Sequence, residues 1–149
     1  MVVFTRGNIF YSQAQALINP VNCMGVMGAG LALQFKQQFP INFTVYAEAC
    51  KAKQLNPGGL VAFTEKEKVI INLATKDHWR NPSKLQYIKD GLQALVRYTT
   101  THHIESVAIP PLGCGLGGLN YRKDVKPLIN DILGGVPSVK FMIYEPSKY

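Results

Sequence analysis

Glycines gather in two loops of this chain, and each loop follows a short apolar run. The first loop carries Gly25, Gly28 and Gly30 and comes after the apolar residues 16–18. The second loop, residues 110–121, comes after the apolar run 106–109. A glycine loop that opens a helix presents free backbone N–H groups and the positive end of the helix dipole, which suit a phosphate. The two loops together predict a site for a diphosphate.

The placement of these loops supports the prediction of a ligand site. Each loop is expected at the carboxyl end of a buried strand, which is where ligands of open α/β sheets bind. Glycine there permits positive φ and a close approach of the ligand to the backbone. The spacing is neither that of a P-loop nor G-x-G-x-x-G, and a glycine loop alone can be a plain tight turn.

The rest of the chain alternates short apolar runs with amphipathic stretches. We expect strands over residues 2–5, 16–18, 59–64, 69–73, 106–109 and 139–144, the third and fourth forming a hairpin. We expect helices that begin after Gly30, at Pro40 or Asn42, after Ser83 as N-cap and after Asn120 as N-cap. Their expected buried faces include Phe43, Tyr46, Ala47 and Cys50, and then Leu85, Ile88, Leu92, Leu95 and Val96. This order predicts one three-layer α/β/α sandwich with a mixed sheet of about six strands.

Composition describes an ordinary folded domain with a basic surface. The chain has 149 residues and 47% hydrophobic residues, which is enough for a core and argues against disorder. Its formal net charge of +7 favours an anionic partner, either nucleic acid or a phosphorylated ligand. Many small basic proteins owe their charge to solubility alone, so charge supports a DNA partner only weakly.

The chain has 3 cysteines, Cys23, Cys50 and Cys114, without a C-x-x-C pair. The odd number and the spacing predict neither a disulfide framework nor a zinc site. Cys23 and Cys114 lie in the glycine loops, where small apolar filler is favoured over a nucleophilic role. Free thiols fit a reducing cytoplasm, and the longest apolar runs fall far short of the roughly 20 residues of a membrane span. We expect a cytoplasmic protein without a signal peptide or a membrane span.

Three stretches resemble the macro domain family, the ADP-ribose-binding fold. They are Gly7-Asn8-Ile9, Asn19-Pro20-Val21-Asn22-Cys23 with residues 25–30, and residues 110–121. The resemblance covers nearly the whole chain and implies a single macro domain over residues 1–149. It implies ADP-ribose as ligand or product, without a separate cofactor or a metal. The ADP-ribose contacts that it implies are Asn8, Ile9, Asn19, Asn22, Gly25, Val26, Met27, Gly28, Gly30, Pro111, Gly113, Cys114, Gly115, Leu116, Gly117 and Gly118.

Within that family the chain most resembles the DarG-type DNA ADP-ribosyl glycohydrolases. Residues 26–36, 75–80 and 112–115 carry this resemblance. Such antitoxins remove ADP-ribose from thymidine in DNA after a DarT-type toxin has attached it, and the terminal ADP-ribose protein glycohydrolases are a related branch. The expected partners are single-stranded DNA with thymidine-linked ADP-ribose and a DarT-type toxin, and the protein is expected to be a monomer.

The resemblance gives catalytic roles to Asn22 and Lys76. Asn22 matches the asparagine that holds ribose hydroxyls in macro domains, and Lys76 matches the essential lysine of the two glycohydrolase branches. A lysine attacks only as the neutral amine, which cations from His78 and Arg80 would favour. Lys76 has two open roles, attack on the distal ribose and electrostatic support of the departing thymine.

Two positions depart from the pattern of the family. Asn8 stands where most macro domains have the aspartate that receives the adenine amino group, and its amide oxygen still accepts that bond without a charge. Gly117 stands where the protein-directed glycohydrolases have an aspartate, and its absence favours the DNA-directed branch. The alternatives that stay open are a glutamyl-ADP-ribose glycohydrolase, an ADP-ribose 1″-phosphate phosphatase and a non-catalytic ADP-ribose reader.

Trp79 is the only tryptophan and stands between His78 and Arg80. An exposed aromatic ring in a basic loop stacks on a base while the cations meet phosphates. A buried tryptophan that pins the loop to the core is the equally weighted alternative. The candidate DNA contacts are His78, Trp79, Arg80 and Lys84.

Overall fold

The fold alternates strands and helices along the chain. A computed structural model describes residues 1–114 and 117–146. In chain order the elements are β1 (Val2–Thr5), the 3-10 turn η1 (Ile9–Tyr11), β2 (Ala16–Val21), α1 (Gly30–Gln38), α2 (Pro40–Lys51), β3 (Leu60–Glu65), β4 (Lys68–Ala74), α3 (Leu85–Thr101), β5 (Ser106–Ile109), the π-helical segment η3 (Tyr121–Val125), α4 (Lys126–Leu133) and β6 (Lys140–Tyr144).

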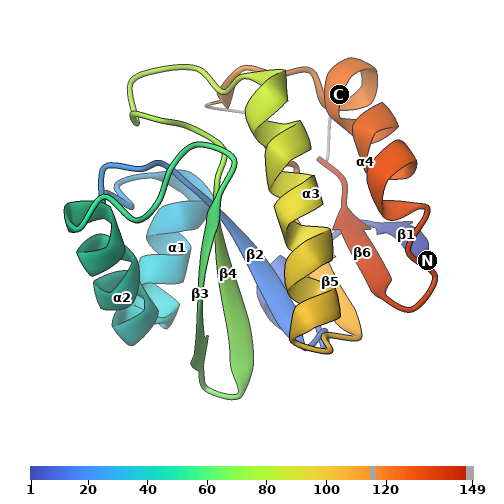
Figure 1. Cartoon of the computed structure of the whole chain (residues 1–149), viewed down its shortest axis with the longest axis horizontal. Coiled ribbons are helices and arrows are strands. Elements are labelled where there is room, and N and C mark those ends of the chain that lie inside the picture. Colours follow the sequence, from blue (N-terminus) through green and yellow to red (C-terminus); the bar gives the residue numbers. More distant parts are fainter. Residues whose placement is uncertain (115–116, 147–149) are drawn as a thin grey trace.

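The strands form one mixed sheet of 6 strands in the order β1-β6-β5-β2-β4-β3. All neighbouring pairs are parallel except the hairpin of β3 and β4. The expected mixed, six-stranded sheet and its hairpin are therefore confirmed. Because β1, β2, β4, β5 and β6 run in one direction, the loops that follow them meet at one edge of the sheet (Figure 1, top).

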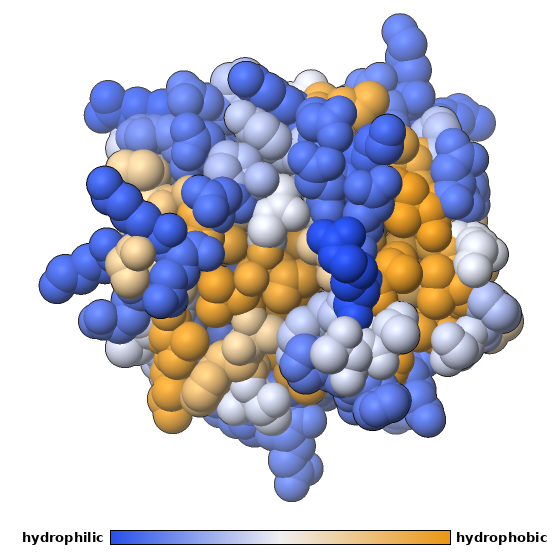
Figure 2. Space-filling view, viewed as in Figure 1, coloured by the Kyte–Doolittle hydropathy of each residue, from blue (hydrophilic) through white to orange (hydrophobic). Residues whose placement is uncertain are grey.

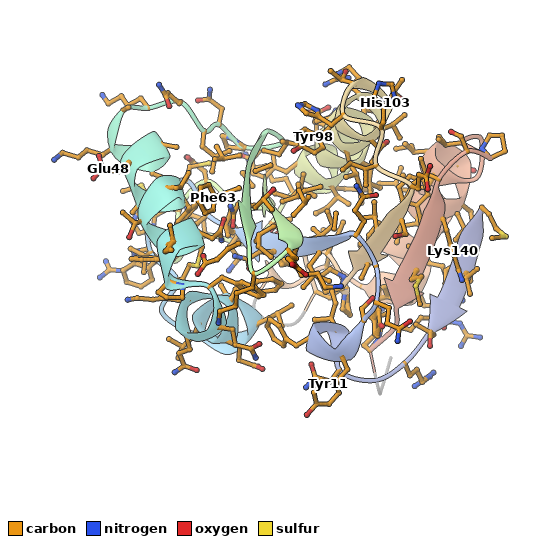
Figure 3. All side chains as sticks on the ribbon, turned by 90° about the horizontal axis from the view of Figure 1, so that it is seen from below. Tyr11, Glu48, Phe63, Tyr98, His103 and Lys140 are labelled. Carbon is orange, nitrogen blue, oxygen red and sulfur yellow. The ribbon has the colours of Figure 1, made fainter. Side chains whose placement is uncertain are left out.

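Side chains alternate between the two faces of the sheet, and each face has its own helices. Ile18 and Ile71 pack with residues of α3 and α4, whereas Leu17 and Ile70 pack with residues of α1 and η1. Figure 3 shows Tyr98 of α3, and His103 just after this helix, on the opposite side of the sheet from Tyr11 of η1. The outward face of α3 is hydrophilic and is flanked on both sides by hydrophobic residues (Figure 2). The expected three-layer sandwich is confirmed.

The start of α3 differs from the prediction. Lys84, not Ser83, is the N-cap of this helix, and no side chain caps it. The N–H of Ser83 instead donates to the carbonyl of Gly117 at 2.9 Å, which fixes Ser83 against the second glycine loop. Leu85 keeps 39% of its surface exposed, so the expected buried stripe begins only at Ile88.

The buried face of α2 is also rotated from the prediction. Asn42, Tyr46 and Ala49 are buried, whereas Phe43, Ala47 and Cys50 are only half-buried. The polar residue Asn42 can face the core because Glu65 and Asn72 form hydrogen bonds with it there. Its N–H donates to a carboxylate oxygen of Glu65 at 2.7 Å, and that buried carboxylate lies at the positive end of the α2 dipole.

A network of buried asparagines lies beneath α2. The amide of Asn72 is at its centre and exchanges hydrogen bonds of 2.9 and 3.1 Å with Asn42. It also accepts from Asn19 at 3.1 Å and donates to the carbonyl of Val61 at 3.0 Å. All three asparagines have no exposed surface. The network thus fastens α2 to β2, β3 and β4 by polar contacts that water does not reach.

We predict that Asn72→Ala lowers the free energy of unfolding by about 1–3 kcal/mol, because it leaves buried amide groups of Asn19 and Asn42 unpaired. Urea unfolding measures this change. Thr64→Ala on the exposed side of β3 is the control, and it should stay within about 0.5 kcal/mol of the unaltered protein. Equal effects of the two substitutions would show that the network does not stabilise the fold.

Candidate functional site

A cavity of about 800 Å³ opens at the carboxyl ends of the parallel strands. The loops after β2, β4 and β5 form its walls, together with the start of α1 and the segment after β6. The residues that line it are Pro20, Val21, Asn22, Val26, Gly28, Ala29, Gly30, Leu31, Ala32, Thr75, Lys76, Trp79, Ser83, Pro110, Pro111, Gly113, Cys114, Gly117 and Pro146. Both predicted glycine loops and both candidate catalytic residues therefore meet in one place.

The side chain of Asn22 is held in one orientation by its own loop. Its amide nitrogen donates to the carbonyl of Val26 at 2.8 Å, and its amide oxygen accepts from the N–H of Met24 at 2.9 Å. These bonds define which end of the amide is oxygen and which is nitrogen. One N–H of the amide nitrogen remains for a ligand in the cavity.

Tyr46 supports Asn22 from below. Its hydroxyl lies 2.8 Å from the backbone carbonyl oxygen of Asn22 and 2.9 Å from the side-chain oxygen. The ring is fully buried, and burial raises the pKa of Tyr46 far above its usual value, so the hydroxyl keeps its proton and acts as a donor. The sequence predicted Tyr46 only as part of a buried helix face, because nothing in the local pattern connects α2 with the first glycine loop.

Lys76 lies directly beside this loop. Its N–H donates to the carbonyl of Val21 at 3.4 Å, and its own carbonyl accepts from the thiol of Cys23 at 3.5 Å. A further bond of 3.0 Å joins the N–H of Cys23 to the carbonyl of Asp77. The backbone that carries Lys76 is thus tied to the backbone that carries Asn22.

The second glycine loop passes close to the side chains around it. A Cβ on Gly113 (φ +70°) would lie 2.7 Å from Leu119 and 3.0 Å from Ile88, so this position requires glycine. A Cβ on Gly117 would lie 2.8 Å from Ser83 Oγ and 3.9 Å from Lys76 Cε. Gly115 and Leu116, two of the expected ADP-ribose contacts, lie outside the described residues.

Trp79 stands at the rim of the cavity with 46% of its surface exposed. Of the two alternatives for Trp79, the structure therefore shows the exposed ring and not the buried one. The ring centroid of His78 lies 5.1 Å from that of Trp79, and the Arg80 guanidinium lies 4.5 Å above the Trp79 ring. Lys84 is exposed a few residues further on. Trp79, Arg80 and Lys84 thus form an exposed aromatic and cationic rim, and His78 is half-buried beside the tryptophan ring.

Some of the expected ADP-ribose contacts do not line the main cavity. Asn19 and Met27 are buried in the core, where the Asn19 amide donates to the Met27 sulfur at 3.6 Å. Their side chains face α2, so they support the first loop from beneath. Gly25 packs toward α2, where its Cβ would lie 3.6 Å from Cys50. Gly118 is exposed and lies outside the lining of the cavity.

Asn8 and Ile9 border a second, neighbouring hollow of about 430 Å³. This hollow shares Leu31, Pro110 and Pro111 with the main cavity, so the two are continuous along one wall. The side-chain oxygen of Asn8 accepts from the N–H of Phe10 at 2.9 Å and still has a lone pair for a further donor.

The cysteines at the site are not poised for attack. Burial raises the pKa of the Cys23 thiol to about 12 and that of the Cys114 thiol to about 11. Both stay protonated at neutral pH, whereas the nucleophilic form is the thiolate. This supports their interpretation as small apolar filler. Within the described ranges, no group of His, Cys, Asp and Glu side chains could hold a metal ion, and no helix is long and apolar enough to span a membrane.

We predict that Tyr46→Phe weakens the binding of ADP-ribose, the ligand that the resemblance implies, because Asn22 loses the donor that orients it. The free energy of unfolding should fall by about 1 kcal/mol. Calorimetric titration and urea unfolding measure the two changes. Tyr98→Phe, near the end of α3 that lies away from the cavity, is the control for loss of a tyrosine hydroxyl. If the two variants bind ADP-ribose equally well, Tyr46 does not orient Asn22.

Comparison with known proteins agrees with this geometry. A family model described as Macro domain matches residues 18–127. The chain is 43% identical to the DNA ADP-ribosyl glycohydrolase of Mycobacterium tuberculosis over 99% of its own length, but it spans only 43% of that relative. The chain thus covers less than half the length of the curated relative that it matches.

Two solved structures resemble the chain closely. The macrodomain of Mycobacterium tuberculosis DarG superposes with a TM-score of 0.95 at 43% identity, and the match covers 99% of both chains. The structure described as Thermosipho africanus DarTG in complex with ADP-ribose superposes with a TM-score of 0.92 at 34% identity, over 99% of this chain and 42% of that one. The family match, the sheet and the paired glycine loops together show that this chain belongs to the macro domain family.

Proposed function

We propose that this chain is a DNA ADP-ribosyl glycohydrolase that removes ADP-ribose from thymidine in single-stranded DNA and so antagonises a DarT-type toxin. The observation that carries the proposal is the presence of Lys76 and Asn22 in one cavity, between two glycine loops. The similarity to a DNA ADP-ribosyl glycohydrolase over nearly the whole chain supports the activity. The similarity to a DarTG structure with ADP-ribose supports the ligand and the partner.

The two hollows suit the two ends of ADP-ribose. The adenine end enters the smaller hollow beside Asn8 and Ile9, and the diphosphate lies between the glycine loops, where backbone N–H groups are near. The distal ribose then reaches the larger cavity, where Asn22 and Lys76 lie. In this pose the C1″–nitrogen bond to thymine is directed toward the rim that carries Trp79.

Hydrolysis breaks that C1″–nitrogen bond, and water supplies a hydroxyl to C1″ and a proton to the thymine nitrogen. Positive charge develops on the ribose and negative charge on the departing base. Asn22 holds the ribose through hydroxyl contacts, which keeps C1″ in place. Two roles for Lys76 are compatible with its position: attack by its amine on the sugar, and stabilisation of the departing base by its ammonium group.

The exposed rim is suited to the DNA strand that carries the modified base. Trp79 offers a ring face on which a neighbouring base stacks, and Arg80 and Lys84 offer cations to phosphates. The formal net charge of +7 favours approach of a nucleic acid. The protein is further proposed to act as a monomer in the cytoplasm, and its free cysteines fit a reducing compartment.

The proposal is tested by incubating the chain with an oligonucleotide that carries thymidine-linked ADP-ribose. A protein with glutamyl-linked ADP-ribose and free ADP-ribose 1″-phosphate are tested in parallel. Release of ADP-ribose from the oligonucleotide alone is the expected result. Turnover of only one of the other substrates would assign that activity instead, and binding of ADP-ribose without any turnover would make the chain a reader.

We predict that Lys76→Ala lowers kcat on the oligonucleotide at least about 100-fold, the low end of what one positioned catalytic group contributes. The affinity for ADP-ribose should change little, because the diphosphate and adenine contacts remain. Lys140→Ala, at the opposite end of the parallel strands, is the control for loss of a lysine. Near-normal turnover by Lys76→Ala would remove the lysine from the mechanism.

The replacement Lys76→Arg separates the two roles of this lysine. Its guanidinium stays protonated, so arginine cannot attack the sugar but still supplies positive charge. Partial recovery of turnover would assign the electrostatic role. Failure of arginine, together with a lysine–sugar adduct trapped by borohydride in the unaltered protein, would assign attack by the amine.

We predict that Arg80→Ala weakens binding of the modified oligonucleotide and lowers the slope of log K against log[salt] by roughly 1, because one phosphate contact is lost. The affinity for free ADP-ribose should stay unchanged. Arg97→Ala on α3 removes a charge of the same sign and is the control. An unchanged salt slope in Arg80→Ala would argue against a phosphate contact.

A further inference from the structure

Ser83 lies at the site, although the sequence did not predict it there. It is 6% exposed and lines the cavity, although its position before a helix predicted a capping serine. Its backbone N–H is bonded to the carbonyl of Gly117, so the residue is held firmly in the wall. Its hydroxyl has no hydrogen-bond partner among the described residues. A buried hydroxyl without a partner is uncommon and lowers the stability of the fold.

Ser83 Oγ shares this condition with one other buried side-chain atom of the described chain, Asn19 Oδ1. Asn19 is enclosed in the core, where its amide nitrogen already has partners. Only Ser83 adjoins the cavity. Its hydroxyl is therefore the unsatisfied buried group that lies next to the cavity.

The position of Ser83 specifies which part of a ligand it meets. Ser83 Oγ lies 2.8 Å from the point where a Cβ on Gly117 would stand, and Lys76 Cε lies 3.9 Å from the same point. The hydroxyl and the lysine side chain thus both lie next to Gly117. Because Gly117 has no side chain, no atom of that residue fills this point. The serine lies at the reacting end of the site, away from the hollow beside Asn8.

We propose that Ser83 is a further catalytic residue, whose hydroxyl donates a hydrogen bond to a carbonyl oxygen of the departing thymine. This inference rests on the proposed glycohydrolase function. Breaking the C1″–nitrogen bond moves the electron pair onto the base, and its negative charge spreads to the carbonyl oxygens. A donor aimed at developing charge lowers the barrier more than it stabilises the ground state. The serine proton stays on the serine, while the thymine nitrogen takes its proton from the hydrolytic water.

Because the Ser83 hydroxyl has no hydrogen-bond partner, an experiment can distinguish a catalytic role of this serine from a structural one. Ser83→Ala removes a hydroxyl that has no bond to lose, so the melting temperature should stay the same or rise. Turnover of the modified oligonucleotide should nevertheless fall, by at least about 10-fold in kcat, as expected for loss of a donor to developing charge. The affinity for free ADP-ribose should stay within about 2-fold, because this ligand has no thymine carbonyl to accept the serine's hydrogen bond.

Ser12→Ala is the matched control, since Ser12 is equally buried but its hydroxyl accepts from the N–H of Ala14 at 3.1 Å. This variant should lose stability and keep normal kcat, the reverse of Ser83→Ala.

The experiment measures melting temperature, affinity for ADP-ribose and kcat for the unaltered protein and for both variants. Normal kcat in Ser83→Ala would overturn the role of the serine and leave the proposed function intact. A fall in stability would show a structural serine, and weakened affinity for ADP-ribose would show a contact with the sugar in place of the base. Absence of turnover in the unaltered protein would overturn the proposed function and this inference together.

Discussion

The parallel pairing of β2 with β4 is the interaction on which the site depends. Its register sets Val21 opposite Ala74, so the residues that follow the two strands leave the sheet side by side. The carbonyl of Val21 accepts from the N–H groups of both Thr75 and Lys76, which continues the contact beyond the last paired residues. Asn22 and Lys76 therefore stand next to each other because the backbone places them there. A site supported by rigid strands is more precise than one supported by loops alone.

Polar contacts beneath the sheet complete this placement from the side of α2. The helix is joined to β4 through Asn42 and Asn72, and it carries the Tyr46 hydroxyl to Asn22. A hydrophobic face alone would hold the helix but would allow it to slide along the sheet. Buried polar groups that are paired in only one arrangement exclude such shifts, because any other arrangement leaves them unpaired. The helix is thereby fixed in the one position where Tyr46 supports the cavity.

Most of the fold could be predicted from the sequence, because strands and helices follow the period of apolar residues. The strand of residues 106–109 and the hairpin of β3 and β4 were predicted within a residue or two. The faces of α2 and the role of Ser83 could not be, since both depend on partners far away in the sequence. A serine before a helix normally caps it, whereas the backbone bond to Gly117 holds Ser83 in the wall of the cavity.

Site residues that belong to a sequence motif could be predicted. Which of them face the cavity could not, because that depends on the face of the strand or loop on which each side chain lies. The glycine loops, Asn22 and Lys76 were found from the sequence, and Asn22, Lys76 and part of each loop line the cavity. Asn19 belongs to the same motif but shares a face with Val21, which points toward α2, whereas Asn22 lies past the end of the strand.

The space at Gly117 also limits how this domain can change during evolution. A Cβ there would lie 2.8 Å from Ser83 Oγ, so an acidic residue would have to displace the serine hydroxyl, and a carboxylate-assisted site therefore couples these two positions.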